Sequence, residues 1–417
     1  MAESTYIKQR KHERSKEERT VMAVYACITG RIASSQLFEA ILPPTVVRIM
    51  ELAFICGMIW FTFKVVISGK YHKYVGWPLA LIVLLAICNS LIIIRGNYAG
   101  GIKSILLDKF AIDGIPVYIL PFVILLLPNR RYFLSILEVL FYSVLLMLPI
   151  WLINSVDLLQ EAFYGESVGA YLPFFCPLLF LFWRKIDIRK IVLLLVIYLF
   201  YFILMLLNAR RNMIVSLSLF FIVALLASNS TLLRRNMRAI ILVISAVILS
   251  ITIVVASWGT LSTTLFDRVL YRGVENTRSQ VELLFIYDLA SSPASDWIIG
   301  RGIDGAYEQI TQNMETMETQ TERDVIETGY LYLILKGGIV YLLLIMLFLF
   351  TAFFKGISFH KPLFTGLSLF LLIYLLDLYM TNPVSFFSVK TVLFWFIVSL
   401  CLQYSVSIAP KIKKTDR

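Results

Sequence analysis

Two neighbouring arginines stand in a short turn between strongly apolar segments. Arg210 and Arg211 occupy the sequence Asn208-Ala209-Arg210-Arg211-Asn212, with no carboxylate nearby in the sequence. A planar guanidinium grips phosphate oxygens with two parallel hydrogen bonds, so the pair suits a phosphate or diphosphate at a membrane boundary. The alternative is that the two positive charges simply cap a helical hairpin.

A long polar segment, residues 258–327, holds twelve carboxylates and five arginines but no lysine. Its arginines are Arg268, Arg272, Arg278, Arg301 and Arg323. Charges spaced three or four residues apart around Glu275 and Glu282 predict a helix with ion pairs along it. Apolar positions such as Leu284 and Phe285 suit an amphipathic helix lying on a membrane surface. One or two of the arginines could still face inward and bind an anionic ligand.

Glu327 stands where the chain returns to apolar sequence, just before Tyr330 and Leu331. A carboxylate at this point either interacts with the dipole of the helix that follows or acts as a general base at the water–lipid boundary. Further along, Gly337 and Gly338 predict a break between a short helix and the next membrane span.

The glycine-rich stretch 300–305 (Gly-Arg-Gly-Ile-Asp-Gly) lacks the Gly-Lys-Ser/Thr of a P-loop and follows no clear strand. It is therefore predicted to be a turn that leads into another helix, not a nucleotide site. The histidines, His12, His72 and His360, all fall on the predicted cytoplasmic side, and no Asp-rich metal motif is present. Chemistry outside the membrane is thus expected to use carboxylates and arginines, with no metal and no cofactor.

Composition indicates what must position these residues. Of the 417 residues, 59% are hydrophobic and 16% charged, with a mean hydropathy of +0.81, which is typical of a polytopic membrane protein. The net charge of +11 is explained by basic residues in short loops and tails, so no nucleic-acid partner is expected. The predicted fold is all-α. Its clear spans are residues 46–68, 77–94, 113–127, 132–153, 169–183, 191–207, 212–227, 239–257, 338–354, 362–380 and 391–408.

Charge asymmetry predicts a twelfth span at residues 21–42, although this stretch carries Arg31 and Glu39. Basic clusters recur at alternate connections, and both this alternation and the basic N-terminus hold only if 21–42 crosses the membrane. One intervening connection, with Arg95, Lys103 and Lys109, departs from the pattern. The resulting organisation is a cytoplasmic tail (1–20), nine helices (21–257), one large external loop (258–329), three helices (330–408) and a second cytoplasmic tail (409–417).

The chain resembles the O-antigen polymerase and ligase superfamily of bacterial envelope glycosyltransferases. The likeness consists of about twelve transmembrane helices, arginines at a short external turn (Arg210 and Arg211), a loop arginine (Arg278) upstream of a Gly-x-Gly turn, and re-entry at Glu327. Ligases of this superfamily carry a histidine at re-entry, so Glu327 favours a polymerase. The resemblance implies catalytic roles for Glu327 and Arg278 and substrate binding by Arg210, Arg211, Arg301 and Arg323.

The implied reaction polymerises polyprenyl-diphosphate-linked oligosaccharide repeat units of O-antigen, capsule or exopolysaccharide on the outer face of the bacterial cytoplasmic membrane. Arginines would stabilise the departing diphosphate and a carboxylate would take the proton of the acceptor hydroxyl. The expected partners are the lipid-linked glycan, membrane lipid and a chain-length regulator protein. The alternatives are an O-antigen ligase, a lipid-linked oligosaccharide flippase or other transporter, and a structural protein. The intramembrane Asp377 is either a functional group or a structural polar contact.

Overall fold

The computed structural model describes residues 15–35, 42–98, 105, 109–111, 113–158, 175–182, 186–207, 211–228, 277–312, 319–326, 328–380, 384 and 386–403. This part of the chain is mostly helical and contains one two-stranded sheet. Its elements are α2 (Lys16–Ala33), α3 (Pro44–Ile67), α4 (Trp77–Ile94), α6 (Ile115–Leu126), α7 (Phe133–Leu158), α9 (Phe175–Leu181), α10 (Ile188–Leu207), α11 (Arg211–Ser228), α15 (Thr277–Ser291), α16 (Ala294–Ile299), β1 (Tyr307–Gln312), β2 (Thr319–Arg323), α17 (Gly329–Ile357), α18 (Pro362–Met380) and α19 (Val389–Gln403).

Three helices of the described part are long and apolar enough to cross a membrane: α3 from Thr45, α4 and α17. Shorter apolar stretches of 10–17 residues occur within α6, α7, α11, α18 and α19. These lengths and compositions are those of a helical membrane protein. The total of twelve spans stays a prediction, because the expected span 239–257 lies outside the described residues.

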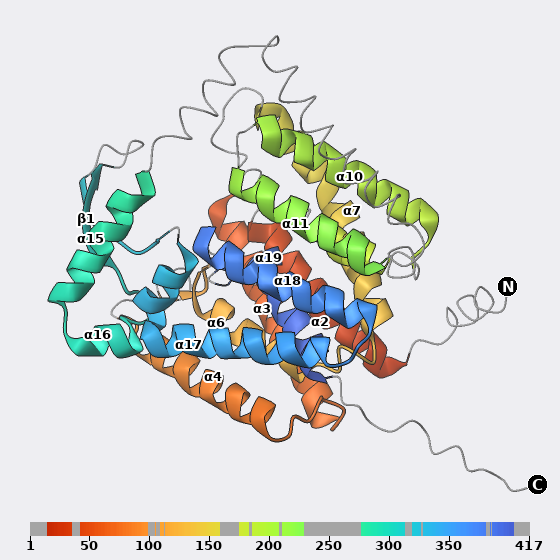
Figure 1. Ribbon diagram of the computed structural model, residues 1–417, viewed down its shortest axis with the longest axis horizontal. Helices are drawn as coiled ribbons and strands as arrows, with labels where there is room; N and C mark the ends of the chain where they lie inside the picture. The colour runs from red at the N-terminus through yellow and green to blue at the C-terminus, as the bar shows by residue number, and fades with distance from the viewer. Residues whose placement is uncertain are drawn as a thin grey trace, which may run out of the picture.

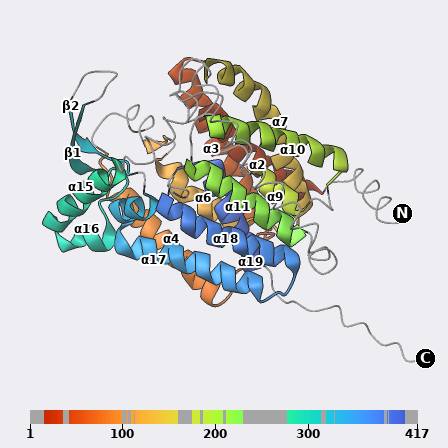
Figure 2. The ribbon, with the colours of Figure 1, turned by 45° about the horizontal axis from the view of Figure 1, so that its top comes forward.

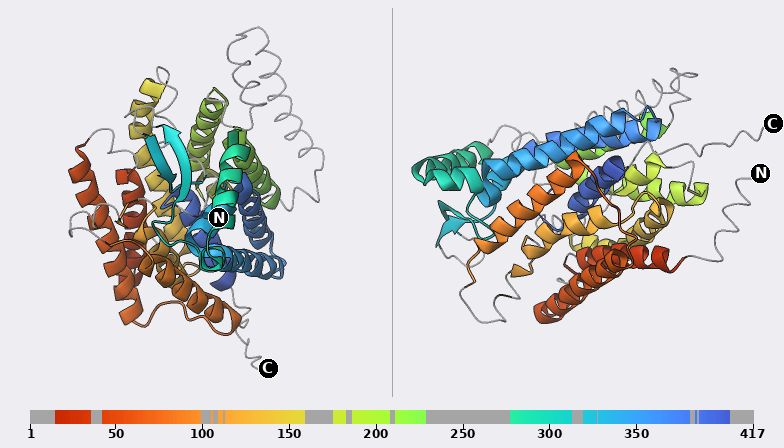
Figure 3. Two further views of the ribbon diagram at one scale, coloured as in Figure 1. Left: turned by 90° about the vertical axis from the view of Figure 1, so that its left-hand side faces the viewer. Right: turned by 90° about the horizontal axis from the view of Figure 1, so that it is seen from below.

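The helices form a bundle with two distinct ends. The helices α15 and α16 and the strand β1 lie at one end, on the left of Figure 1. We call this the loop end. From there α17 runs toward the opposite end beside α4, as the right-hand view of Figure 3 also shows. The helices α2 and α3 pack closely on each other within the same bundle.

The opposite end of the bundle gathers basic residues from several connections. Lys70 Nζ lies 3.3 Å from the Glu17 carboxylate, and Arg131 Nη1 lies 3.6 Å from the same group. Lys355 donates to the carbonyl of Leu402 over 2.6 Å. The connections that carry Lys70, Arg131 and Lys355 therefore meet at the same end of the bundle, as the alternating basic clusters predict.

The helix α2 belongs to the bundle core despite its charges. It begins at Lys16, within the expected N-terminal tail, where the Ser15 hydroxyl caps it by accepting from the Glu18 N–H over 3.2 Å. Its buried apolar side chains repeat at helical spacing and include Val21, Val24, Tyr25, Ile28 and Ile32. The burial agrees with a helix inside the bundle here, and Glu39 lies outside the described residues.

The break predicted at Gly337-Gly338 is confirmed. Gly338 has φ 70° and ψ −176°, which is not helical, so α17 consists of a short first part and a long second part. Positive φ favours glycine because it has no Cβ to clash with the backbone. The first part is buried and packs with α15 and β1 in a small second core that contains Phe285, Tyr307 and Leu335.

The glycine-rich stretch 300–305 leads into a strand, so the predicted following helix is wrong. β1 pairs with β2 in an antiparallel hairpin, with Tyr307 opposite Arg323 and Gln312 opposite Thr319 (Figure 2). The physical reason is that residues 307–312 offer no apolar repeat of helical period. Tyr307 instead buries its ring edge-on against Phe285 of α15, with the centroids 5.5 Å apart. The prediction of an all-α fold is therefore wrong in one respect, because the described residues include one β-hairpin.

Candidate functional site

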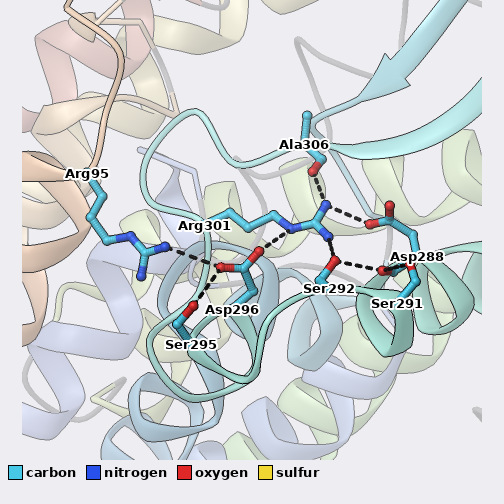
Figure 4. A network of polar contacts seen from close by, with 8 residues as sticks. All are labelled: Arg95, Asp288, Ser291, Ser292, Ser295, Asp296, Arg301 and Ala306. Atoms are coloured by element: carbon cyan, nitrogen blue, oxygen red, sulfur yellow. Dashed lines mark hydrogen bonds and ion pairs between the residues drawn. The ribbon is translucent and has the colours of Figure 1, made fainter.

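Arg301 lies at the centre of a polar network at the loop end (Figure 4). Its Nε donates to Asp296 over 3.2 Å, and its Nη2 donates to the Ser292 hydroxyl over 2.5 Å. Its Nη1 lies 2.6 Å from the Asp288 carboxylate and donates to the Ala306 carbonyl over 2.5 Å. All three nitrogens of the guanidinium are thus engaged by the protein, and two carboxylates balance its charge.

This network ties the end of α4 to the loop. Arg95 Nη2 approaches Asp296 from the side away from Arg301, at 3.3 Å. A second ion pair joins Lys109 to Asp304, which also accepts from the Asn97 N–H over 2.6 Å. Nearby, burial and the Asp304 charge raise the pKa of the Tyr98 hydroxyl, which donates to the Ile93 carbonyl over 2.5 Å.

The turn after α16 docks onto the break in α17. The Arg301 N–H donates to the Leu335 carbonyl over 2.7 Å, and the Gly302 N–H donates to the Lys336 carbonyl over 2.9 Å. A break in a helix deprives such carbonyls of their usual partners four residues later, and the turn supplies replacements. The backbones touch: a Cβ on Gly300 would lie 2.4 Å from the Gly337 nitrogen.

Lys336 is buried beneath this turn, with 2% of its surface exposed. Its ammonium donates to the carbonyls of Ile303 and Gly305, over 2.9 and 3.0 Å, and lies 5.3 Å from the centroid of the Tyr332 ring. Carbonyl dipoles and a ring face therefore solvate the charge in place of water. The sequence predicted that Lys336, before Gly337 and Gly338, marks a break in the helix, but not that its ammonium anchors the turn.

Arg31 is the least satisfied cation of the described residues at the loop end. It is 1% exposed, its guanidinium carbon lies 4.1 Å from the centroid of the Phe387 ring, and its Nη2 donates to the carbonyls of Phe110 and Ala111. Its Nε and Nη1 have no hydrogen-bond partner within the described chain. Burying unpaired donors of a charged group is costly, so the site favours an additional acceptor.

Two carboxylates complete what we call the loop-end cluster: Arg31, Asp113, Asp324, Tyr332 and Lys336. Asp113 precedes α6 and interacts electrostatically with Arg31, Tyr332 and Lys336. Asp324 follows β2, is exposed, and interacts with Tyr332 and Lys336. The cluster thus combines cationic donors of α2 and α17 with the carboxylates that precede α6 and follow β2.

No protein-family model, curated protein sequence or solved structure matches this chain significantly. Only the residues of the loop end therefore indicate what chemistry it can carry out.

The structure describes the side chains of only two residues predicted from the sequence to act at the site. Arg301 is held by the network above. Arg323 ends β2 next to Asp324 of the loop-end cluster and is partly exposed. Arg278 lies in the first turn of α15 and Arg211 begins α11, but their side chains lie outside the described part, as do Arg210 and Glu327.

Residue type alone could not identify the cluster. Arg31 counted against a membrane span in the sequence, because an arginine inside one is costly. The same arginine was also an indication of function, because a charge inside a membrane span is a functional candidate. Asp113 opens an apolar segment and Asp324 is one of twelve loop carboxylates, so only the folded arrangement distinguishes them.

A separate buried ion pair lies among α11, α18 and α19. Lys390 Nζ is 2.8 Å from the Asp377 carboxylate, which also accepts from the Ser216 hydroxyl over 3.0 Å. Neither charged side chain is more than 1% exposed. Asp377 therefore makes a buried polar contact within the bundle, as one of the two alternatives from the sequence requires.

Proposed function

We propose that this protein is a membrane glycosyltransferase that polymerises polyprenyl-diphosphate-linked oligosaccharide repeat units. The observation that supports it best is the loop-end cluster, in which Arg31 interacts with Asp113, and Lys336 with both Asp113 and Asp324, while two donors of Arg31 have no partner within the described chain. An anionic lipid-linked donor and a hydroxyl acceptor need these two kinds of group together. The cluster also lies at the loop end of the helical bundle, and its Asp324 is exposed.

In the proposed reaction, the acceptor hydroxyl oxygen bonds to the anomeric carbon of the donor glycan. The bond from that carbon to the diphosphate oxygen breaks, and the hydroxyl proton passes to a carboxylate. Arg278, with Arg210, Arg211 and Arg323, would bind the diphosphate and stabilise its growing charge. Arg301 would join them only by giving up its present contacts with Asp288 and Asp296.

Glu327 remains the proposed base, because it is the carboxylate at the start of α17. If it is not the base, Asp324 is the better second choice than Asp304. Asp304 already accepts from Asn97 and is paired with Lys109, whereas Asp324 is exposed and has no ion pair within 4 Å among the described residues. A base must be free to take a proton from the substrate, and an ion-paired carboxylate is poorly suited to it.

The proposal includes a location and partners. The protein would lie in the bacterial cytoplasmic membrane with both termini in the cytoplasm and the loop end outside. Its ligands would be lipid-linked O-antigen, capsule or exopolysaccharide units, with a chain-length regulator protein as a partner.

The test is deletion of the gene, followed by gel analysis of surface polysaccharide. Single repeat units on the lipid anchor support a polymerase, and unchanged polymer overturns the proposal. Complementation with Glu327→Gln should leave polymer absent at normal protein abundance, while Glu327→Asp should restore part of it. Native polymer from the Gln variant would remove Glu327 from the reaction.

A ligase or a flippase would instead lose all surface glycan on deletion. The flippase has one specific observation in its favour, the buried Asp377–Lys390 pair, because intramembrane ion pairs also occur on transport pathways. Accumulation of untranslocated lipid-linked units inside cells would distinguish it from a ligase.

A further inference from the structure

The helix α15 differs from a helix on a water-exposed surface, because its carboxylates lie on the inward side and its exposed side is apolar. Its carboxylates point into the protein: Glu282 accepts from the Thr328 hydroxyl, and Asp288 is paired with Arg301 at 2.6 Å. Phe285 and Leu289 are buried on the same inward side.

The outward side of α15 is apolar. Leu283 is 51% exposed and Tyr287 is 68% exposed, and the exposed positions between Leu283 and Ser291 include no charge. The other large exposed side chains on this face are Leu284 and Ile286. Exposing this apolar surface to water would cost about 25 cal/mol per Å², while the charged groups of the helix lie on its inward side.

This apolar face continues into a membrane-spanning helix. Ile298 of α16 is 52% exposed, and its carbonyl lies directly against Gly338 at the break in α17. The next residues of α17, Ile339 and Val340, are exposed as well, and so is Leu343 one turn later. All three belong to a candidate membrane span, so the lipid that covers them also reaches α16.

The orientation of α15 fits the same surrounding. In Figure 1 it stands across the loop end, whereas α17 runs along the bundle. A helix that lies across the end of membrane-spanning helices is parallel to the membrane surface. Aromatic residues with one polar atom, such as Tyr287, favour that boundary.

We propose that α15 and α16 form an interfacial helix pair whose outward face (Leu283, Leu284, Ile286, Tyr287 and Ile298) is immersed in the lipid of the membrane surface. The lipid holds the hairpin and the loop-end cluster at the level of the headgroups. This placement does not depend on which reaction the protein catalyses. A second copy of the chain is the competing occupant of the face.

The experiment uses the full chain reconstituted in phospholipid vesicles, with the five native cysteines replaced. Single cysteines at Leu283 and Tyr287 carry an environment-sensitive fluorophore, and the matched control is a cysteine at the exposed hairpin residue Glu308. We expect the labels at 283 and 287 to emit at shorter wavelength than the label at 308. Spin-labelled phospholipid should quench them, and aqueous iodide should not.

Two outcomes overturn the proposal. Iodide quenching at 287 equal to that at 308 would place the face in water. Protection from both quenchers that disappears on dilution with excess lipid would assign the face to a second copy. Because both labelled positions are exposed, a cysteine there leaves the buried core unchanged, and circular dichroism of each variant confirms the fold.

Discussion

Arg95 and Asp296 lie 3.3 Å apart although 201 residues of sequence separate them. With the Lys109–Asp304 pair, this contact joins the connection after α4 to the large loop of residues 258–329. That connection was the exception to the alternation of basic clusters. Of its positive charges, Arg95 and Lys109 are paired with loop carboxylates in the folded chain, so these two do not argue against the topology that the other clusters predict.

Gly338→Ala should destabilise the protein far more than Gly69→Ala. Both glycines have positive φ, 70° and 67°, so each substitution strains the backbone, and Gly338, with ψ −176°, lies in a region that essentially only glycine occupies. Only at Gly338 would the new Cβ meet backbone, 2.2 Å from the Ile298 carbonyl oxygen, whereas Gly69 has open space. Thermal unfolding in detergent checks this, and equal Tm losses would show that α16 does not depend on the break.

Arg31→Met should lower activity with little change in Tm. Methionine keeps much of the apolar bulk and removes donors that the described residues leave unpaired, which offsets the loss of the cation facing Glu51 and of the bonds to the Phe110 and Ala111 carbonyls. If Arg31 binds the anionic ligand, polymer formation should fall, and Arg31→Lys should not restore it because it lacks the planar fork. A large Tm loss with Met would mean that Arg31 serves only to hold the carbonyls of Phe110 and Ala111.

Lys390→Met alone should destabilise the protein by about 3–5 kcal/mol, since it leaves the Asp377 carboxylate buried without its cation. The double variant Lys390→Met with Asp377→Asn should recover most of that loss. Denaturation in a detergent series measures both. Failure of the second substitution to recover stability would show that the pair is not coupled as the contact suggests.

Stability should fall as the medium is acidified below about pH 6.5, through His72. Burial and the nearby positive charges of Lys355 and Arg130 lower the pKa of His72 below 6.5, so the folded protein prefers the neutral ring. This contribution is complete above the unfolded pKa and is lost as pH falls through the folded one. Tm from pH 8 to 5 should therefore drop more for the native protein than for His72→Gln, and parallel curves would contradict it.

The apolar segments were predictable because membrane spans follow from local composition. The helices α4 and α18 match the predicted spans 77–94 and 362–380 at both ends. Gly337 and Gly338 correctly predicted the break in α17. Each of these rests on a few adjacent residues. No long-range contact was needed to infer them.

The hairpin and the loop-end cluster could not be predicted in the same way. The strand residues 307–312 and 319–323 are mostly polar, and their pairing depends on the Phe285–Tyr307 contact between separate elements. Lys336 and Ile303 likewise meet only because the turn docks into the broken helix. Neither contact can be predicted from a local sequence pattern, because each joins residues that are distant in the sequence.

The setting of Lys336 imposes an order on assembly. Its ammonium is balanced by the carbonyls of Ile303 and Gly305, which arrive only when the preceding segment folds back over the start of α17. Until those carbonyls are in place, the ammonium needs water to solvate it, and this keeps that part of α17 near the membrane surface. The final seating of α17 in the membrane thus follows closure of the loop, and a chain synthesised without residues 300–305 should insert this helix to a shallower depth.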